Sequence, residues 1–575
     1  MFSDVSDWRQ ITSIWVCDTE FIALPGEHPE PVCLVATEIF SGQTVRLWRH
    51  EMTNARCAPF DCGQTSLFVA YYASAELSVF KACGWAIPIN ILDLFVEFRL
   101  RTNGAYLPFG NGLLGALQYF GMHGMTTEDK DSNRDLIMRG GPWSDEERQR
   151  ILNYCEEDVS ASKQLFLKMQ PGIDLKRALY FRGTYCKAVA EMEYTGVPVD
   201  VVTLSRIQKG WEKIKDKLIA RVNQIIPVYQ DNHFVTALFV RWLSQNGIAW
   251  PLLDSGGLAL DEETFSEMAE KYPQVGLLKE LRINLSKLRT NDLTIGSDGR
   301  NRVMLSPFSS KTGRNQPSTT RNIFGGSKWL RSLITPKPGK FLCYIDWSSQ
   351  EIGIAAKLSN DPNLMEAYRQ DPYIWFARHV GAVPRDATKS SHKLERAIYK
   401  ETMLAVGYGM GVESLAAKIN QPVARARTLL MQHRETFPRY WAWNNAAVNH
   451  ALARLNIHTR SGWILNVDDR PKVTSLQNWP MQANGADIMR MAACMMVEAG
   501  LKICCPVHDA FLVEGLVGRE QETISEAQKQ MARASAFFLD GFELRSEAEI
   551  IMPGERLHDE RGRLFYQMIM DLLQE

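Results

Sequence analysis

The stretch Phe341-Leu-Cys-Tyr-Ile-Asp-Trp347 decides the fold of this chain, together with Pro506-Val-His-Asp-Ala-Phe511 farther along. Both are short apolar runs that predict β-strands, and each carries one aspartate, Asp346 or Asp509. An aspartate at a strand tip is held rigidly while its carboxylate stays accessible. Taken singly, such a residue is more often a helix cap or a turn residue. Taken together, the two predict a shared pair of Mg²⁺ ions and a nucleotidyl-transfer enzyme, because two ions can neutralise both oxygens on which phosphoryl transfer builds up charge.

The segment between the two aspartates supports this interpretation. Arg396, Lys400, Leu404 and Tyr408 follow one another at intervals of four, so on a helix they form one stripe with two cations at its start. Cations there could bind a triphosphate, and the alternating glycines that begin at Gly407 predict the end of the helix and room for a base pair. The simpler alternative is a surface helix whose Arg and Lys are only solvated.

The order of these pieces resembles that of family A DNA polymerases, the group of bacterial DNA polymerase I and many phage replicases. The run that begins at Asp346 is similar to the family's motif A, which implies that Asp346 is a metal ligand and that Glu351 is the steric gate. The stretch from Arg396 to Gly409 resembles motif B. This implies that Lys400 contacts the incoming triphosphate and that Tyr408 lines the site of the nascent base pair.

His508-Asp509 resembles motif C, and three other segments agree with the same family. Thr312-Gly-Arg314 is similar to the stretch whose arginine touches the minor groove near the primer end. Asn478-Trp-Pro-Met-Gln482 resembles the stretch that supports template and primer, and Glu191 to Asp200 looks like the connection that opens the thumb subdomain. The resemblance implies DNA contacts for Arg314, Asn478, Gln482 and His508.

Three positions depart from the family pattern. Leu404, in the substrate-binding stripe, stands where the family has Phe or Tyr, so the response to sugars without a 3′ hydroxyl cannot be carried over. Ala510 follows the motif C aspartate where Glu is common, and Thr474 stands where Arg is usual. Both essential carboxylates remain, so we expect catalysis to remain.

The N-terminal part carries a second signature. Residues 11–17 read as a strand of β-branched and aromatic residues that ends in Asp18-Thr-Glu20, whose two carboxylates project to the same side. Farther on, Ser144 and Glu147 predict a capping box that opens a helix.

On that helix, Tyr154 and Asp158 lie one turn apart on one face. The whole pattern resembles 3′ to 5′ proofreading exonucleases. It implies that Asp18, Glu20 and Asp158 hold metal ions and that Tyr154 positions the attacking water. The simpler alternative is a strand-end turn and a solvated helix face.

The second acidic motif of such exonucleases is Asp in an Asn-x-x-x-Asp context, and here the sequence departs from it. The alignment gives Glu76 in Tyr72-Ala-Ser-Ala-Glu76, whose spacing to Asp93 fits the family. Asp61 is the rival candidate. Because Glu is one methylene longer than Asp, it can still ligate a metal with looser placement, so we expect Glu76 to complete a working nuclease.

The charge balance predicts only local attraction to DNA. With 65 basic and 66 acidic residues the formal charge is -1, so no global field draws the chain to DNA. Lys209, Lys213 and Lys217 fall at intervals of four in a predicted helix and could form a cationic ridge along a phosphate backbone. A solvated helix face is the alternative.

The eleven cysteines show no paired spacing, and we interpret them as reduced core residues rather than as zinc ligands. The chain starts without a basic region and an apolar signal core, and no run approaches the roughly 18 apolar residues that cross a bilayer. We therefore expect a cytoplasmic enzyme without a membrane partner, in the bacterial host cell if a phage encodes it.

The resemblance implies an α/β multidomain fold, in which an RNase H-like 3′ to 5′ exonuclease domain precedes a right-hand polymerase with an antiparallel palm sheet and helical fingers and thumb. The 575 residues fit about three to four domains. The expected boundaries are 1–172 for the exonuclease domain, 173–300 for the thumb, 301–365 for the first part of the palm, 366–454 for the fingers and 455–575 for the second part of the palm.

The expected function is template-directed DNA synthesis at a primer 3′ end with proofreading, in phage DNA replication. The expected cofactors are two Mg²⁺ ions per active site, for which Mn²⁺ could substitute. The expected partners are primer-template DNA and deoxynucleoside triphosphates, bound by a monomer.

Two alternatives remain. A single-subunit RNA polymerase shares the palm, but the bulky gate Glu351 and the exonuclease signature oppose it. An exonuclease or DNA-binding protein with an inactive polymerase half is opposed by the intact Asp346, Lys400, Tyr408 and Asp509.

Overall fold

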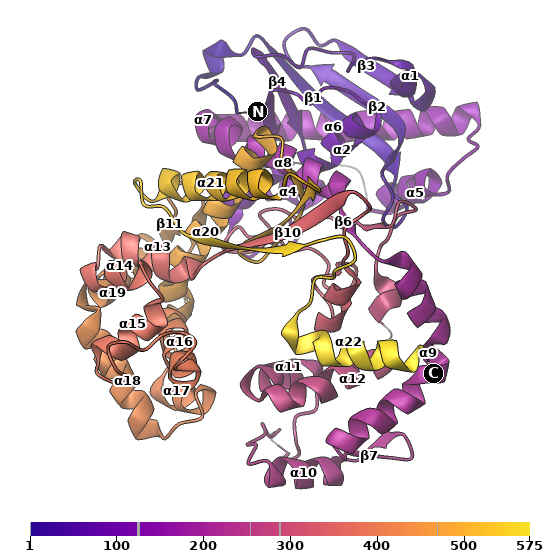
Figure 1. Ribbon diagram of the computed structural model, residues 1–575. Helices are drawn as coiled ribbons and strands as arrows, with labels where there is room; N and C mark the ends of the chain where they lie inside the picture. The colour runs from indigo at the N-terminus through magenta and orange to yellow at the C-terminus, as the bar shows by residue number, and fades with distance from the viewer. Residues whose placement is uncertain (1, 123–126, 254, 287–288, 469, 575) are drawn as a thin grey trace.

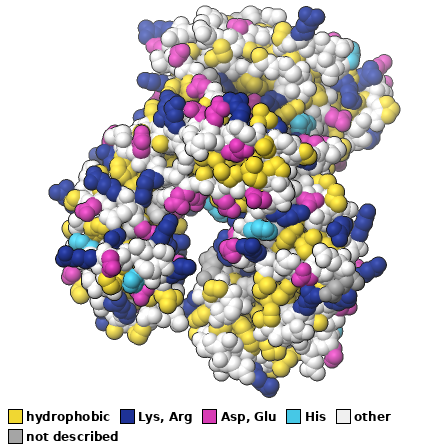
Figure 2. All heavy atoms as spheres, viewed as in Figure 1, with side chains coloured by type: hydrophobic (Ala, Val, Ile, Leu, Met, Phe, Trp, Pro, Cys, Tyr) yellow, Lys and Arg dark blue, Asp and Glu magenta, His cyan; other side chains and the backbone are white. Residues whose placement is uncertain are grey.

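The computed structural model describes residues 2–122, 127–253, 255–286, 289–468 and 470–574. An N-terminal α/β unit lies at the top of the molecule in Figure 1, a small sheet lies at the centre, and two helical lobes extend below it. Figure 2 shows an opening between these two lobes. The fold has the mixed α/β content that the sequence predicts.

The N-terminal unit is built on a five-stranded sheet of order β3-β2-β1-β4-β5, in which β1 pairs antiparallel with β2 and parallel with β4. The strands are β1 (Ser13–Ile22), β2 (Glu30–Glu38), β3 (Thr44–Trp48), β4 (Ser66–Ala70) and β5 (Asn90–Asp93). The sequence predicts a strand over residues 11–17 that ends in Asp18-Thr-Glu20, whereas β1 begins at Ser13 and ends at Ile22. The strand continues to Ile22 because its pairing with β2 includes Asp18 and Glu20.

Helices cover both faces of this sheet. They are α1 (Arg49–Asn54), α2 (Ala73–Ala82), α3 (Leu94–Thr102), α4 (Leu113–Tyr119), α5 (Thr127–Met138) and α6 (Asp145–Met169). The side of β1 that carries Cys17 packs against α2, and the side that carries Val16 packs against α6. The predicted capping box between Ser144 and Glu147 is confirmed at the start of α6.

The central sheet is antiparallel and has the order β13-β14-β10-β15. Its strands are β10 (Lys340–Trp347), β13 (Lys502–Val507), β14 (Ala510–Leu516) and β15 (Ser546–Ile551). The helices α20 (Val473–Glu498) and α21 (Glu520–Phe538) pack against the face that carries Phe341 and Ile345. Because side chains alternate along a strand, Asp346 lies on the opposite face of the sheet.

One lower lobe follows β10 and is entirely helical up to a short hairpin. Its elements are α13 (Gln350–Ser359), α14 (Pro362–Tyr368), α15 (Pro372–His379), α16 (Lys393–Gly407), α17 (Val412–Lys418), α18 (Val423–Thr436), α19 (Pro438–Arg454), β11 (Asn456–His458) and β12 (Ile464–Asn466).

The other lower lobe precedes β10. Its elements are α9 (Val201–Ile225), β7 (Tyr229–Gln230), β8 (His233–Phe234), α10 (Thr236–Gln245), α11 (Glu262–Lys271), α12 (Gly276–Ser286) and the 3-10 helix η6 (Lys328–Leu333). Before this lobe, α7 (Leu175–Arg177) lies beside the N-terminal unit, and α8 (Thr184–Thr195) packs against α2, β13 and α20 (Figure 1). The short strands β6 (Val197–Pro198) and β9 (Arg300–Asn301) pair with each other. The last helix of the chain, α22 (Glu560–Leu572), packs against α9, α12 and η6 in this lobe (Figure 1).

The eleven cysteines are all free thiols, and most are buried as predicted, but Cys57 is exposed, so the core interpretation is wrong for that residue. Within the ranges given above, no helix combines the length and the apolar character that a membrane crossing needs.

Candidate active sites

Asp346 and Asp509 lie side by side at one end of the central sheet. Asp346 is the penultimate residue of β10 and pairs with Ala510, the first residue of β14. The sequence predicts Asp509 on a strand, and this is wrong. Asp509 lies in the two-residue turn that joins β13 to β14. The turn is tight, with His508 at a φ of +55°, and the Trp347 N–H donates to the Asp509 carbonyl oxygen at 3.3 Å. The hairpin therefore brings the second carboxylate to the first.

Asp346 is partly buried and lies near two other carboxylates, those of Asp509 and Glu547. Burial raises the pKa of Asp346 to about 6, with further contributions from the charges of Asp509 and Glu547. Glu547 lies directly opposite Asp346 on β15 and was missed by the sequence analysis. On the other side of Asp346, the facing residue is Ala510, which has no carboxylate.

These carboxylates open into a cleft of about 510 Å³ at the base of the helical lobe after β10. The predicted substrate-binding residues Glu351, Arg396, Lys400 and Leu404 line the same cleft. Figure 2 shows acidic and histidine side chains gathered below the central sheet, at the upper end of the opening between the lobes. A single cleft thus combines acidic residues on its sheet side with cations on its helical side.

The predicted cationic stripe is a feature of α16. Lys400 is exposed on this helix, and Tyr408 caps its C-terminal end, as the spacing predicts. Arg396 is partnered within the protein: its Nε donates to Asp371 Oδ2 at 2.7 Å, and its guanidinium lies 5.1 Å from the centre of the Tyr373 ring. These two contacts fix its direction, and the sequence analysis missed both partners.

Glu351 lies at the centre of a hydrogen-bonded cluster. The Tyr408 hydroxyl donates to Glu351 Oε1 at 3.3 Å, and Gln482 Nε2 donates both to Glu351 and, at 3.2 Å, to the Tyr408 hydroxyl. Burial raises the pKa of Glu351, and the charge of Arg314 opposes this shift. Residues from three separate motifs therefore meet around one carboxylate.

Asn478 and His508 extend this cluster. Asn478 hydrogen-bonds with Tyr408, while in the described part of the chain its buried Oδ1 has no hydrogen-bond partner. Burial lowers the pKa of His508, and the charges of Lys328 and Arg331 on η6 lower it further. These two cations beside the turn were also missed by the sequence analysis.

The lysine ridge lies on α9, where Lys209, Lys213 and Lys217 are exposed at successive turns. Acidic residues interrupt the same helix, and Lys215 pairs with Glu212. The helix is as predicted, and contact of the ridge with DNA stays a prediction.

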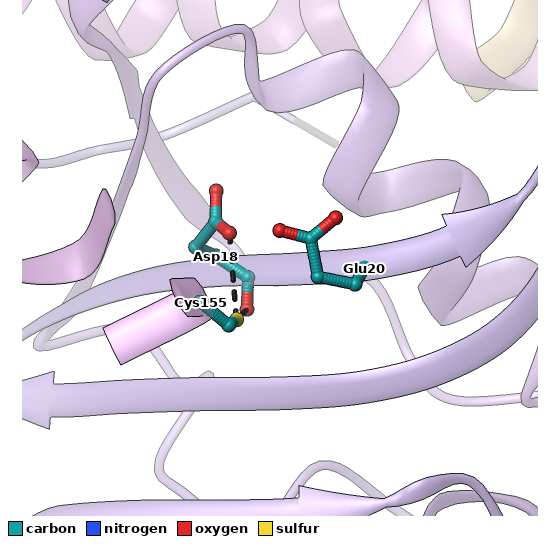
Figure 3. Close-up of side chains that lie close together, drawn as sticks. All are labelled: Asp18, Glu20 and Cys155. Atoms are coloured by element: carbon teal, nitrogen blue, oxygen red, sulfur yellow. Dashed lines mark hydrogen bonds between the residues drawn. The ribbon is translucent and has the colours of Figure 1, made fainter. Parts of the chain in front are cut away.

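The second acidic cluster lies on β1. Figure 3 shows the carboxylates of Asp18 and Glu20 on one side of the strand, with Cys155 of α6 beside Asp18. The Cys155 thiol lies 3.3 Å from the Asp18 carbonyl oxygen and 3.4 Å from Asp18 Oδ2. One ligand atom from each of the three residues lies within 4.8 Å of the others, a spacing that could hold a metal ion. The sequence analysis did not identify Cys155.

Burial, together with repulsion between neighbouring carboxylates, raises the pKa values in this cluster. Burial raises the pKa of Asp18 to about 8, and the charge of Asp158 adds to the shift. Burial also raises the pKa values of Glu20 and Tyr154, with smaller contributions from the neighbouring carboxylates. Lys130 of α5 offsets part of this repulsion, because its Nζ lies 3.1 Å from Asp158 Oδ2. The structure thus brings the predicted Asp18, Glu20, Tyr154 and Asp158 together.

The two candidates for the remaining acidic position lie in different environments. Glu76 is buried in the first turn of α2, accepts a hydrogen bond from the Thr19 hydroxyl, and has its pKa raised by burial and by the charge of Asp18. Thr19 alternates with Asp18 and Glu20, so Glu76 reaches β1 from the other side of the strand. Asp61 is exposed and accepts a hydrogen bond from the Gly63 N–H of its own loop.

Comparisons with known proteins identify the family of the chain. The family model for DNA polymerase family A matches residues 212–549. DNA polymerase I of Thermus thermophilus is 23% identical over 69% of this chain and 50% of its own length. DNA polymerase I of Aquifex aeolicus is 22% identical over 69% of this chain and 75% of its own length. The DNA polymerase of Mycobacterium phage D29 is 23% identical over 44% of each chain. The chain spans about half the length of the Thermus relatives that it matches.

Among solved structures, the polymerase domain of Pol1 from M. smegmatis, in complex with DNA primer-template and dNTP, has a TM-score of 0.69 to this chain. The two are 17% identical, and the match covers 94% of this chain and 96% of that one, so they share a fold. Because the family model matches more than half of its residues, the chain belongs to DNA polymerase family A.

Proposed function

We propose that this protein is a template-directed DNA polymerase that adds deoxynucleotides to a primer 3′ end. The observation that carries the proposal is the cleft in which Asp346 and Asp509 face Arg396 and Lys400. Extension of a labelled primer on a DNA template by the purified protein tests it directly. A protein that binds the primer-template but never extends it would contradict the proposal.

The donor set of the cleft fits a pair of Mg²⁺ ions, with Mn²⁺ as a substitute. Asp346 and Asp509 offer only carboxylate oxygens, and their mutual repulsion is what a divalent cation would relieve. When bound, such ions lower the pKa of the primer 3′ hydroxyl and neutralise the leaving pyrophosphate. Lys400 binds the triphosphate, and Arg396, oriented by Asp371, supports it from the same helix.

Glu351 selects the sugar in this proposal, because its carboxylate is fixed by Tyr408 and Gln482 where a ribose 2′ hydroxyl would have to fit. We expect Glu351→Ala to raise the incorporation of ribonucleotides relative to deoxyribonucleotides by roughly a hundredfold, about 2.7 kcal/mol of lost discrimination. The measurement is kcat/KM for both nucleotides on one primer-template. Glu366→Ala, at an exposed glutamate of α14, is the control. An unchanged ratio in Glu351→Ala would remove the role of sugar selection from Glu351, and a preference of the wild type for ribonucleotides would favour the RNA polymerase alternative.

Glu547 supplies a third carboxylate in this proposal. It lies on β15, which pairs with one edge of β10, whereas Ala510 lies on β14, which pairs with the other edge. We expect Glu547→Ala to weaken Mn²⁺ binding and to slow extension by roughly tenfold. Adding Ala510→Glu should restore both, because residues 510 and 547 flank Asp346 on the same face.

Mn²⁺ affinity from electron paramagnetic resonance, measured without DNA, and the extension rate check this expectation. Glu549→Ala, two residues along β15, is the matched control. A double variant that binds Mn²⁺ no better than Glu547→Ala would show that Glu547 has no part in the site.

We further propose that the N-terminal unit is an RNase H-like 3′ to 5′ exonuclease domain that proofreads. The mixed sheet with helices on both faces supports the fold, and the convergence of Asp18, Glu20 and Asp158 supports the chemistry. Glu76 is the fourth acidic residue, and Tyr154 positions the attacking water. The site fits divalent cations because its carboxylates are crowded and largely unneutralised.

The domain boundaries given from the sequence, at residues 172, 300, 365 and 454, are kept in this proposal, except that α22 packs against α9 and α12 and so lies with the lobe before β10 (Figure 1). Primer-template DNA and deoxynucleoside triphosphates are the proposed partners of a monomer. The resemblance to the phage D29 DNA polymerase supports a role in phage replication.

A further inference from the structure

The loop of residues 306–316, which carries Arg314, has a backbone that its own sequence does not favour. Ser306 and Phe308 have φ values of +49° and +57°, in the left-handed region that residues other than glycine rarely adopt. Conformations of this kind persist only where the surroundings hold them, and they concentrate at functional sites. The contacts that hold this loop therefore determine where Arg314 lies.

One carbonyl oxygen of the loop accepts hydrogen bonds from side chains in three parts of the molecule. The Lys311 carbonyl oxygen accepts from Asn103 Nδ2 at 2.8 Å, from Trp463 Nε1 at 3.3 Å and from Trp479 Nε1 at 3.0 Å. Trp463 lies just before β12, and Trp479 lies on α20 next to Asn478. Asn103, in contrast, follows the last residue of α3 in the N-terminal unit.

Asn103 is completely buried, and it forms further hydrogen bonds with the hairpin of β11 and β12. Its Nδ2 also donates to the Ile464 carbonyl oxygen at 2.7 Å, and its backbone carbonyl oxygen accepts from the Asn466 N–H at 2.9 Å. A Cβ on the next residue, Gly104, would lie 2.2 Å from the Asn466 carbonyl oxygen, so only glycine permits this approach. Arg99, one turn earlier on α3, adds a bond from Nη2 to the Ser309 carbonyl oxygen at 3.1 Å.

Two hydrogen bonds within the loop connect Ser310 to the backbone of Arg314. The Arg314 N–H donates to Ser310 Oγ at 2.7 Å, and the Ser310 N–H donates to the Arg314 carbonyl oxygen at 3.2 Å. The charge of Arg314 in turn acts on the pKa values of Glu351, Tyr408 and His508. A short chain of contacts thus runs from α3 to Arg314, whose charge acts on Glu351 in the cleft.

We propose that Asn103 is a positioning residue for recognition of the primer 3′ end. By holding the Lys311 carbonyl, it sets the place of Arg314, so the N-terminal unit controls how strictly the polymerase cleft distinguishes a paired from a mispaired primer end. This inference rests on the proposed polymerase function.

A double-mutant cycle with Asn103→Ala and Arg314→Ala tests the inference. The readout is the ratio of kcat/KM for extension of a paired primer end to that of a mispaired one. We expect Asn103→Ala to lower this ratio by about tenfold, the size expected when buried hydrogen bonds are lost. The double variant should have the same ratio as Arg314→Ala alone, because Asn103 acts through Arg314. Additive effects of the two substitutions would overturn the inference.

Asn90→Ala is the matched control, because Asn90 is also a buried asparagine whose Nδ2 donates to two carbonyl oxygens, those of Gln64 at 2.8 Å and Ser66 at 2.9 Å. Both acceptors lie within the N-terminal unit, so the ratio should not change. A shift in Asn90→Ala as large as that in Asn103→Ala would reduce the effect to general destabilisation and overturn the inference. If Asn103→Ala fails to fold, the same cycle is run with Asn103→Ser. A wild-type protein that extends no primer would refute the polymerase proposal itself, whereas normal extension with an additive cycle would refute only the role of Asn103.

Discussion

Asp509→Ala is expected to abolish primer extension while leaving excision of single-stranded DNA intact. The substitution removes one of the two aspartates that lie side by side at this end of the sheet, so the charge on the reacting phosphate loses about 4 kcal/mol of stabilisation, roughly a thousandfold in rate. The fold should survive, because Asp509 contributes its backbone carbonyl, not its side chain, to the bond with Trp347. The measurement is the single-turnover extension rate.

Two controls define this result. Asp509→Asn keeps the shape of the side chain and should lose extension to a similar degree. Asp386→Ala, at an exposed aspartate of the loop before α16, should extend normally. Retention of synthesis by Asp509→Ala would remove this residue from the proposed mechanism.

Asp18→Ala is expected to have the opposite effect: excision falls by roughly a thousandfold while extension continues. Asp18 lies close enough to Asp158 for the two charges to interact, and its carboxylate accepts a hydrogen bond from the Cys155 thiol. Its substitution therefore removes a carboxylate from the centre of the cluster. The rate of shortening of a labelled single strand measures the effect.

The same assay separates Glu76 from Asp61. Glu76→Ala should also reduce excision, because Glu76 is buried against Thr19 beside Asp18. Asp61→Ala, at an exposed loop residue, should behave like the wild type. The reverse pair of outcomes would transfer the role to Asp61.

Features with local causes could be predicted from the sequence. The capping box at Ser144 depends on residues three apart, and the stripe from Arg396 to Tyr408 depends on helical spacing, so both follow from short-range rules. The meeting of Asp346 and Asp509 came from the resemblance to a known family, since no local rule brings together strands so far apart in the chain.

Features that depend on strand register or on packing between distant elements could not be predicted. Glu547 faces Asp346 only because β15 pairs with β10 in one register, and a shift of one residue would turn it to the other face. Cys155 and Lys130 join the second cluster through the packing of α6 and α5 on β1. Their spacing along the sequence gives no signal of this role.

The packing of α22 has a consequence for how the protein is made. The apolar side of this helix, with Phe565, Ile569 and Leu572, shares a core with Ile214 and Leu218 of α9. A ribosome releases α9 long before it reaches α22, and domains generally fold in the order of synthesis. The apolar side of α9 that α22 covers therefore stays exposed until α22 has left the ribosome, and a chaperone would be of most use in that interval.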